Sequence, residues 1–237
     1  LQGVTFQLVP MFTMGTLRSP RLVGAGIALV QVGLITLTPA LALGSHAGGI
    51  VGAVTLASGV GCSAVALWTT LRSRRRRGLE PGLKAFLLGA AVLALGTIGG
   101  IALVCLGGRF PAIIAYGVTI VLGALSFMVL GMLCKIVPFL VWMRAYGPRA
   151  GRQRVPQATA LGSQRLETGW WVLHTVALAI VLSGIFLASR AIVASGTQLL
   201  LVAVLGYLAN IARVMAHLFW PQTPAMGGSP RSALASS

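Results

Sequence analysis

Residues Ala85–Gly107, with the sequence AFLLGAAVLALGTIGGIALVCLG, decide the fold because they contain no charged side chain. An α-helix rises 1.5 Å per residue, so this stretch is long enough to cross roughly 30 Å of hydrocarbon. Inside a bilayer a segment must satisfy its own backbone hydrogen bonds, and a lone apolar segment does so as a helix. We therefore expect a transmembrane helix here.

Further apolar runs of similar length cover most of the remaining chain: Leu22–Leu43, Gly48–Thr70, Ala112–Met143, Gly169–Ser189 and Ile192–Phe219. Each reaches the roughly 20 residues that a crossing needs. The run Ala112–Met143 exceeds one straight crossing, so we expect it to tilt or to project past the headgroups, with a bend near Pro138.

The first 17 residues are apolar but too few for a full crossing. We interpret residues 1–17 as the C-terminal part of a transmembrane helix whose beginning precedes Leu1. The predicted fold is all-α: a polytopic transmembrane helix bundle of six full spans within residues 18–220, plus this partial helix. Residues 221–237 are expected to form a flexible cytoplasmic tail.

Composition excludes the main alternatives to a membrane protein. Hydrophobic residues make up 57% of the chain and charged residues only 8%, whereas soluble domains carry roughly a quarter charged residues. The 18 Lys and Arg against 2 acidic residues would suit a nucleic-acid partner, but they lie between apolar runs rather than on an amphipathic face. We therefore expect no nucleic-acid partner, and a lipid bilayer as the main environment.

The basic residues alternate between the two sides of the predicted bundle. One side has only Arg109 and Arg190, and Lys135 and Arg213 lie within helices. The other side holds the remaining 14: Arg18, Arg21, Arg72, Arg74, Arg75, Arg76, Arg77, Lys84, Arg144, Arg149, Arg152, Arg154, Arg165 and Arg231. The positive-inside rule places this basic side, and the C-terminus, in the cytoplasm, where its loops would meet anionic lipid headgroups.

Small residues and tryptophans suggest how the helices pack and where they end. Pairs spaced by four residues, Gly48/Gly52, Gly96/Gly100 and Gly24/Ala28, are predicted to let helix backbones approach closely. Tryptophans recur near the predicted cytoplasmic ends of helices, where we interpret them as an interfacial aromatic belt: Trp142, Trp170, Trp171 and Trp220.

Two short segments resemble each other. The segment Gly3–Phe12, GVTFQLVPMF, and the segment Gly131–Leu140, GMLCKIVPFL, share Gly, Val and Pro at the same three positions. Three whole predicted helices separate them, so the period would be four helices. Chance similarity between two kinked helix ends and an internally duplicated bundle both explain the match.

These segments, with the second extended to Trp142 (GMLCKIVPFLVW), also resemble a poorly characterised group of bacterial multi-pass membrane proteins. That group is distantly similar to haem–copper oxidase subunit I and to NnrS-like proteins. The resemblance implies a subunit of a respiratory or other electron-transfer complex in the bacterial inner membrane, working with other membrane subunits. It also implies haem as the expected cofactor, copper as a less favoured one, and a chain that binds neither as the alternative.

The chain departs from that family in its histidines. An oxidase core needs six metal-ligating histidines, whereas this sequence has three, His46, His174 and His217. The chain alone therefore cannot complete an oxygen-reducing centre. Two alternatives remain open: a non-catalytic structural or assembly subunit, and a permease for copper or another small solute.

His174 and His217 are the candidate haem ligands, since both are predicted in the cytoplasmic half of adjacent helices. Arg213 lies four residues before His217 on the same helix face and would hold a haem propionate or a lipid phosphate. The competing interpretation is that the two histidines hydrogen-bond to neighbouring residues and that Arg213 extends to the headgroups.

Lys135 is the charge predicted deepest in the membrane, about 13 Å along its helix from Arg144. Ionisable residues at such depth are functional candidates, so Lys135 is predicted to serve a proton path or to neutralise a buried anion. Alternatively, its stem reaches the interface. The two carboxylates, Glu80 and Glu167, are both expected in loops, so no paired-acid catalysis is predicted.

Overall fold

The computed structural model describes residues 19–73, 78, 80–149 and 155–220, together with residues 3, 5–7 and 10. Within this part the chain is helical and contains no strand. The helices are α2 Pro20–Ala42, α3 His46–Arg72, α4 Pro81–Leu106, α5 Phe110–Val118, the π-helix η1 Thr119–Leu125, α6 Ser126–Ala145, α7 Gln164–Phe186 and α8 Arg190–Ala216, with short 3₁₀ turns η2 Gly147–Arg149 and η3 Ala158–Ala160.

Among the described residues, six helical segments are long and apolar enough to cross a membrane, with α5, η1 and α6 forming one continuous segment, Phe110–Ala145. This confirms the predicted fold class. Of residues 1–17, those that are described are helical, and the rest of that segment lies outside the described residues, as does the tail 221–237. Pro138 lies inside α6, whereas the change from α to π geometry occurs earlier, in η1.

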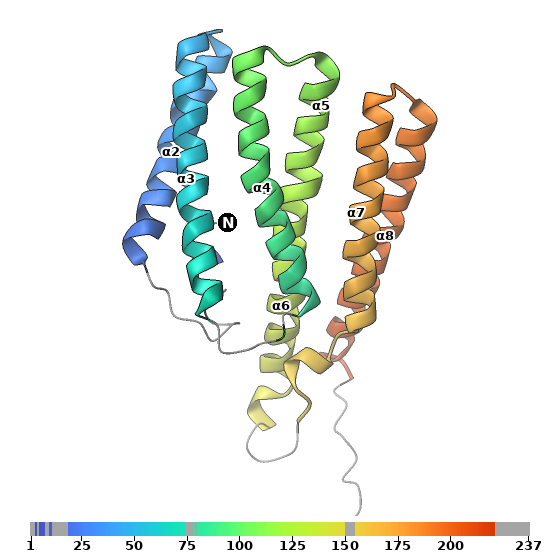
Figure 1. The fold of residues 1–237 in the computed structure, drawn as a ribbon. Helices are drawn as coiled ribbons and strands as arrows, with labels where there is room; N and C mark the ends of the chain where they lie inside the picture. Colours follow the sequence, from blue (N-terminus) through green and yellow to red (C-terminus); the bar gives the residue numbers. More distant parts are fainter. Residues whose placement is uncertain are drawn as a thin grey trace, which may run out of the picture.

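The helices form three antiparallel pairs that stand side by side, α2 with α3, α4 with the α5–η1–α6 segment, and α7 with α8 (Figure 1). At one end, which we call the short-turn end, neighbouring helices are joined by residues 43–45, 107–109 and 187–189. The longer connections lie at the opposite, long-loop end (Figure 1). The described basic residues divide accordingly, with Arg109 and Arg190 at the short-turn end and Arg72, Lys84 and Arg144 at the long-loop end.

Local sequence signals explain where the helices begin. Pro20 and Pro81 occupy first turns, where a missing N–H costs no hydrogen bond. The Ser45, Ser163 and Ser189 hydroxyls accept hydrogen bonds from backbone N–H groups three residues on. The Ser163 cap starts α7 at Gln164, five residues before the apolar run Gly169–Ser189, so polar residues form its first turn.

Glycine lets α2 and α3 pack backbone to backbone. A Cβ atom placed on Gly33 would lie 2.5 Å from the Leu56 backbone nitrogen, and one on Gly59 would lie 2.6 Å from the Val30 nitrogen. The predicted contact positions Gly48/Gly52 and Gly96/Gly100 are likewise crowded by neighbouring side chains or backbone. The prediction for Gly24 is wrong, because nothing lies within 4 Å of a Cβ there.

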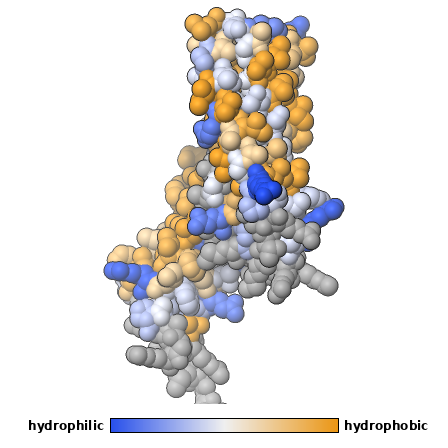
Figure 2. Space-filling model, turned by 90° about the vertical axis from the view of Figure 1, so that its left-hand side faces the viewer, coloured by the Kyte–Doolittle hydropathy of each residue, from blue (hydrophilic) through white to orange (hydrophobic). Residues whose placement is uncertain are grey.

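The outward faces of the helices are apolar. Large side chains such as Ile35 and Leu95 are 71% and 68% exposed. On the face seen in Figure 2, hydrophobic side chains cover most of the column and the strongly hydrophilic ones gather mainly toward its lower part. Exposing this much apolar surface to water would be strongly unfavourable. The architecture is that of a multi-pass membrane protein.

Candidate functional site

Lys135 on α6 forms an ion pair with Glu80, the residue that immediately precedes α4. The two side chains are 11% and 21% exposed. Two glycines bring the helices together at this point, because a Cβ on Gly131 would lie 2.6 Å from the carbonyl oxygen of Gly82. Gly131 is one turn before Lys135 and Gly82 follows Glu80 closely, so the glycine contact sets the register that joins the two charges.

Glu167 is the second carboxylate at this site. It lies in the first turn of α7, is 8% exposed, and is electrostatically coupled to Lys135. The prediction that both carboxylates lie in loops is therefore wrong for Glu167. The reason is the Ser163 cap, which extends α7 beyond its apolar run and turns Glu167 toward the bundle.

Asn210 on α8 anchors Glu167. Its Oδ1 accepts a hydrogen bond from the Ser163 backbone N–H at 2.8 Å, so its Nδ2 is the group that donates to the Glu167 carboxylate. Asn210 is 1% exposed. Gly162 packs closely above both groups, since a Cβ there would lie 3.4 Å from Glu167 Oε1 and 3.5 Å from Asn210 Nδ2.

We call Glu80, Lys135, Glu167 and Asn210 the Lys135 cluster. Its members come from the start of α4 and from α6, α7 and α8, and they include both acidic residues of the whole sequence. Burying charges is costly unless they are paired and hydrogen-bonded, and each charge here has such a partner. The three ionisable side chains of the cluster can accept and release protons.

A buried aromatic cluster adjoins the Lys135 cluster. Trp170 contacts Tyr207 at a ring-centroid distance of 5.4 Å, and Phe127 contacts His174 at 4.7 Å. Trp170 is nearly fully buried, so its assignment to an interfacial belt is wrong. It lies one turn beyond Glu167 on the same face of α7, and that face points into the bundle.

His174 is 2% exposed and binds the π-helix. Its Nε2 lies 2.9 Å from the carbonyl oxygen of Leu122, and because a carbonyl only accepts, Nε2 carries the proton and donates. The Nδ1 atom is buried and has no hydrogen-bond partner among the described residues.

His217 lies just past the end of α8, and its Nδ1 is 3.0 Å from the hydroxyl of the fully buried Tyr146. Arg213, one turn earlier, is exposed. The structure therefore places His174 beside Phe127 and Trp170 and places His217 beside Tyr146. The two predicted haem ligands have separate surroundings.

These positions bear on whether the residues present fit a haem. Both imidazoles are engaged with protein groups, and neither lines the cavities between α3 and α4, between α7 and α8, or near His46. In the described part of the chain, no group of three or more His, Cys, Asp or Glu side chains is placed to hold a metal ion. In this arrangement His174 and His217 do not fit a haem held between the two of them. Haem binding by this chain is not tested otherwise and stays a prediction.

Lys135 was predictable from the sequence as a functional candidate, but its partners Glu80, Glu167 and Asn210 were not predicted. One signal was available, since a chain with only 2 acidic residues has few ways to neutralise a cation inside the membrane. The chain matches no protein-family model, no curated protein and no solved structure.

Proposed function

We propose that this chain is an integral subunit of an electron-transfer complex of the bacterial inner membrane, oriented with its long-loop end in the cytoplasm. Within it, the Lys135 cluster takes up and releases protons. The observation that carries the proposal is that one lysine inside the helix bundle is paired with Glu80 and interacts electrostatically with Glu167, the two carboxylates of the sequence.

Energetics support a functional role for the cluster. Ionisable groups within membrane helices are costly, and well-packed apolar residues of similar volume often stabilise a fold as well or better. The bundle already has backbone-to-backbone glycine contacts to hold it together. We therefore propose that the cluster serves to bind and move charge rather than to hold the helices together.

The geometry suggests how a proton would move. Glu80 is the more exposed carboxylate, at the N-terminus of α4 and toward the long-loop end, whereas Glu167 is buried against Asn210. Lys135 interacts with both. A proton arriving at Glu80 would weaken its hold on the Lys135 ammonium, which would then shift toward Glu167. Proton uptake and charge movement inside the bundle would thus be linked.

The electron-transfer part of the proposal rests on the resemblance of Gly3–Phe12 and Gly131–Trp142 to haem–copper-related membrane proteins. Lys135 lies within the second of these segments. The partners would be other membrane subunits that carry the redox groups, since His174 and His217 are both engaged with protein groups.

The test uses the full-length protein in its native host. The gene is deleted and replaced with wild type, Lys135→Met, the double variant Lys135→Met/Glu80→Gln, or Arg144→Met, whose lost cation is exposed on the same helix. Respiration-driven proton release by whole cells is measured, and the tagged protein is purified in mild detergent for a reduced-minus-oxidised spectrum. We expect a redox spectrum in the purified complex, with proton release lowered in both Lys135 variants and normal in Arg144→Met.

The outcomes separate the alternatives. A complex that lacks any redox spectrum overturns the electron-transfer role and leaves the assembly subunit or the solute permease. Unchanged proton release in the Lys135→Met/Glu80→Gln variant overturns the role of the cluster, provided that the variant protein is present in the membrane at the wild-type level.

A further inference from the structure

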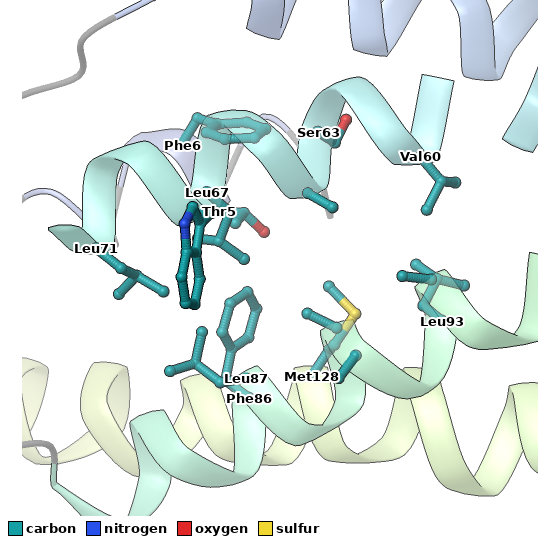
Figure 3. A pocket seen from close by; sticks show the side chains of 15 residues that line it. Thr5, Phe6, Val60, Ser63, Leu67, Leu71, Phe86, Leu87, Leu93 and Met128 are labelled. Atoms are coloured by element: carbon teal, nitrogen blue, oxygen red, sulfur yellow. The ribbon is translucent and has the colours of Figure 1, made fainter. Parts of the chain in front are cut away.

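An apolar cavity of about 320 Å³ lies between α3 and α4, where the α2–α3 pair faces the middle pair of helices, and Thr5, Phe6 and Met128 also line it. Figure 3 shows Ser63, Leu67 and Leu71 on one side of it and Phe86 and Leu87 on the other. Its lining is almost wholly hydrocarbon. The Ser63 hydroxyl donates to the Gly59 carbonyl oxygen, so it is already satisfied.

The cavity runs along the half of α3 that leads to the long-loop end. Its lining on α3 extends from Val60 to Leu71, which corresponds to about 16 Å along a helix. One leaflet contributes roughly half of the 30 Å hydrocarbon core. The cavity therefore has the depth of a single leaflet.

Two cations lie just beyond the cavity lining, at the ends of α3 and α4 that lead to the long-loop end. Arg72 follows Ala64 and Trp68 on one face of α3, and its guanidinium lies 5.0 Å from the centre of the Trp68 ring. Trp68 is 58% exposed and lines the cavity. Lys84 is exposed and precedes the lining residue Leu87 on the same face of α4.

From this combination we infer that the α3–α4 cavity binds an anionic phospholipid, with an acyl chain among the apolar residues and the phosphate between Arg72 and Lys84. Charge complementarity argues for an anionic headgroup, since Arg72 and Lys84 are both exposed cations, whereas the Glu80 carboxylate one turn before Lys84 is paired with Lys135. The nearly complete lack of polar lining argues against the ring of a quinone, which needs hydrogen-bond donors deep in its site. Trp68 completes the site by placing its ring at the level of the lipid glycerol, as interfacial tryptophans do.

The test is native mass spectrometry of the full-length protein in detergent, with phosphatidylglycerol or phosphatidylethanolamine of identical acyl chains. We expect a preference for phosphatidylglycerol that falls about fivefold in Arg72→Gln and again in Lys84→Gln, since each basic residue near an anionic headgroup contributes a factor of this order. Arg21→Gln is the control, because Arg21 is exposed on α2, a helix that contributes no residue to the cavity lining. Ala90→Phe, which fills the cavity, should lower binding of both lipids.

A second measurement does not depend on packing variants. One equivalent of phosphatidylglycerol brominated on its acyl chain should quench the tryptophan fluorescence of the wild type, and it should quench that of Trp68→Phe much less. Phosphatidylethanolamine brominated in the same way should have a weak effect on both proteins. Equal binding of the two lipids overturns the inference. So does an equal loss of selectivity in Arg21→Gln and Arg72→Gln, or displacement of the bound lipid by a short-chain quinone.

Discussion

At the scale of single residues, the ion pair between Lys135 and Glu80 shows how one deep charge is stabilised. Lys135 has two carboxylates near it, and only Glu80 pairs with it directly. Removing the lysine would leave two carboxylates without their cation, whereas removing lysine and Glu80 together leaves Glu167 with its Asn210 hydrogen bond. Single and double substitutions should therefore differ in stability.

We predict that Lys135→Met and Glu80→Gln each lower the free energy of unfolding, and that the double variant loses less than their sum. The expected coupling is about 1–3 kcal/mol, typical of residues in one charge network. Thermal unfolding in detergent measures it, with Arg144→Met as the exposed control. Strictly additive losses in the free energy of unfolding would mean that Lys135 and Glu80 have no energetic coupling.

Asn210 provides a second residue-scale prediction. Replacement by Ala leaves the Ser163 N–H and the Glu167 carboxylate without their partner, and an unsatisfied buried polar group costs about 1–3 kcal/mol. Gln198→Ala is the matched control, since Gln198 carries the same amide on an exposed position of α8. Equal melting temperatures for the two variants in detergent would contradict the proposed anchoring.

At the scale of helices, close packing depends on which glycines face a neighbouring backbone. Gly59 and Gly61 lie on the same helix, yet a Cβ on Gly59 would lie 2.6 Å from the Val30 nitrogen while Gly61 has nothing within 4 Å. The sequence pattern identified some contact glycines, such as Gly52, but wrongly included Gly24. Spacing alone does not show which face of an apolar helix meets a partner and which meets lipid.

We predict opposite signs for alanine at these two positions. Gly59→Ala forces α2 and α3 apart and should cost about 1–3 kcal/mol, as overpacking does. Gly61→Ala meets open space and should stabilise the protein by up to about 1 kcal/mol, because alanine favours the helix. Unfolding of both variants in detergent checks this, and a Gly59→Ala variant as stable as Gly61→Ala would rule out the backbone contact.

The start of α7 and the π-helix show what sequence reasoning missed among the elements. Glu167 follows the Ser163 cap by four residues, so the signal for a longer helix was present, but the apolar run was used as its boundary. The π-helix has no comparable signal in the sequence Thr119–Leu125. It forms where the His174 side chain of another helix binds the Leu122 carbonyl, and that contact depends on tertiary packing.

At the scale of the whole molecule, the segments with potential to span the membrane were predictable from the sequence. A crossing helix needs about 20 apolar residues, and the length of each apolar run can be read directly from the sequence. The division of basic residues between the two ends was also predictable, because successive connections in a chain of antiparallel helices fall at alternate ends of the bundle. The Lys135 cluster was not, because it joins residues 80, 135, 167 and 210 through the packing of separate helix pairs.

Cysteine labelling tests the central claim, a bundle that spans the bilayer with its long-loop end inside the cell. Single cysteines are introduced as Leu43→Cys and Leu187→Cys at the short-turn end and as Gly78→Cys and Thr159→Cys at the long-loop end, all exposed positions, after the three native cysteines are changed to alanine. With a membrane-impermeant maleimide on intact spheroplasts, the account predicts labelling at 43 and 187 only, and labelling at 78 and 159 once the membrane is opened. Labelling of 78 or 159 in sealed spheroplasts, or equal labelling at both ends, would contradict it.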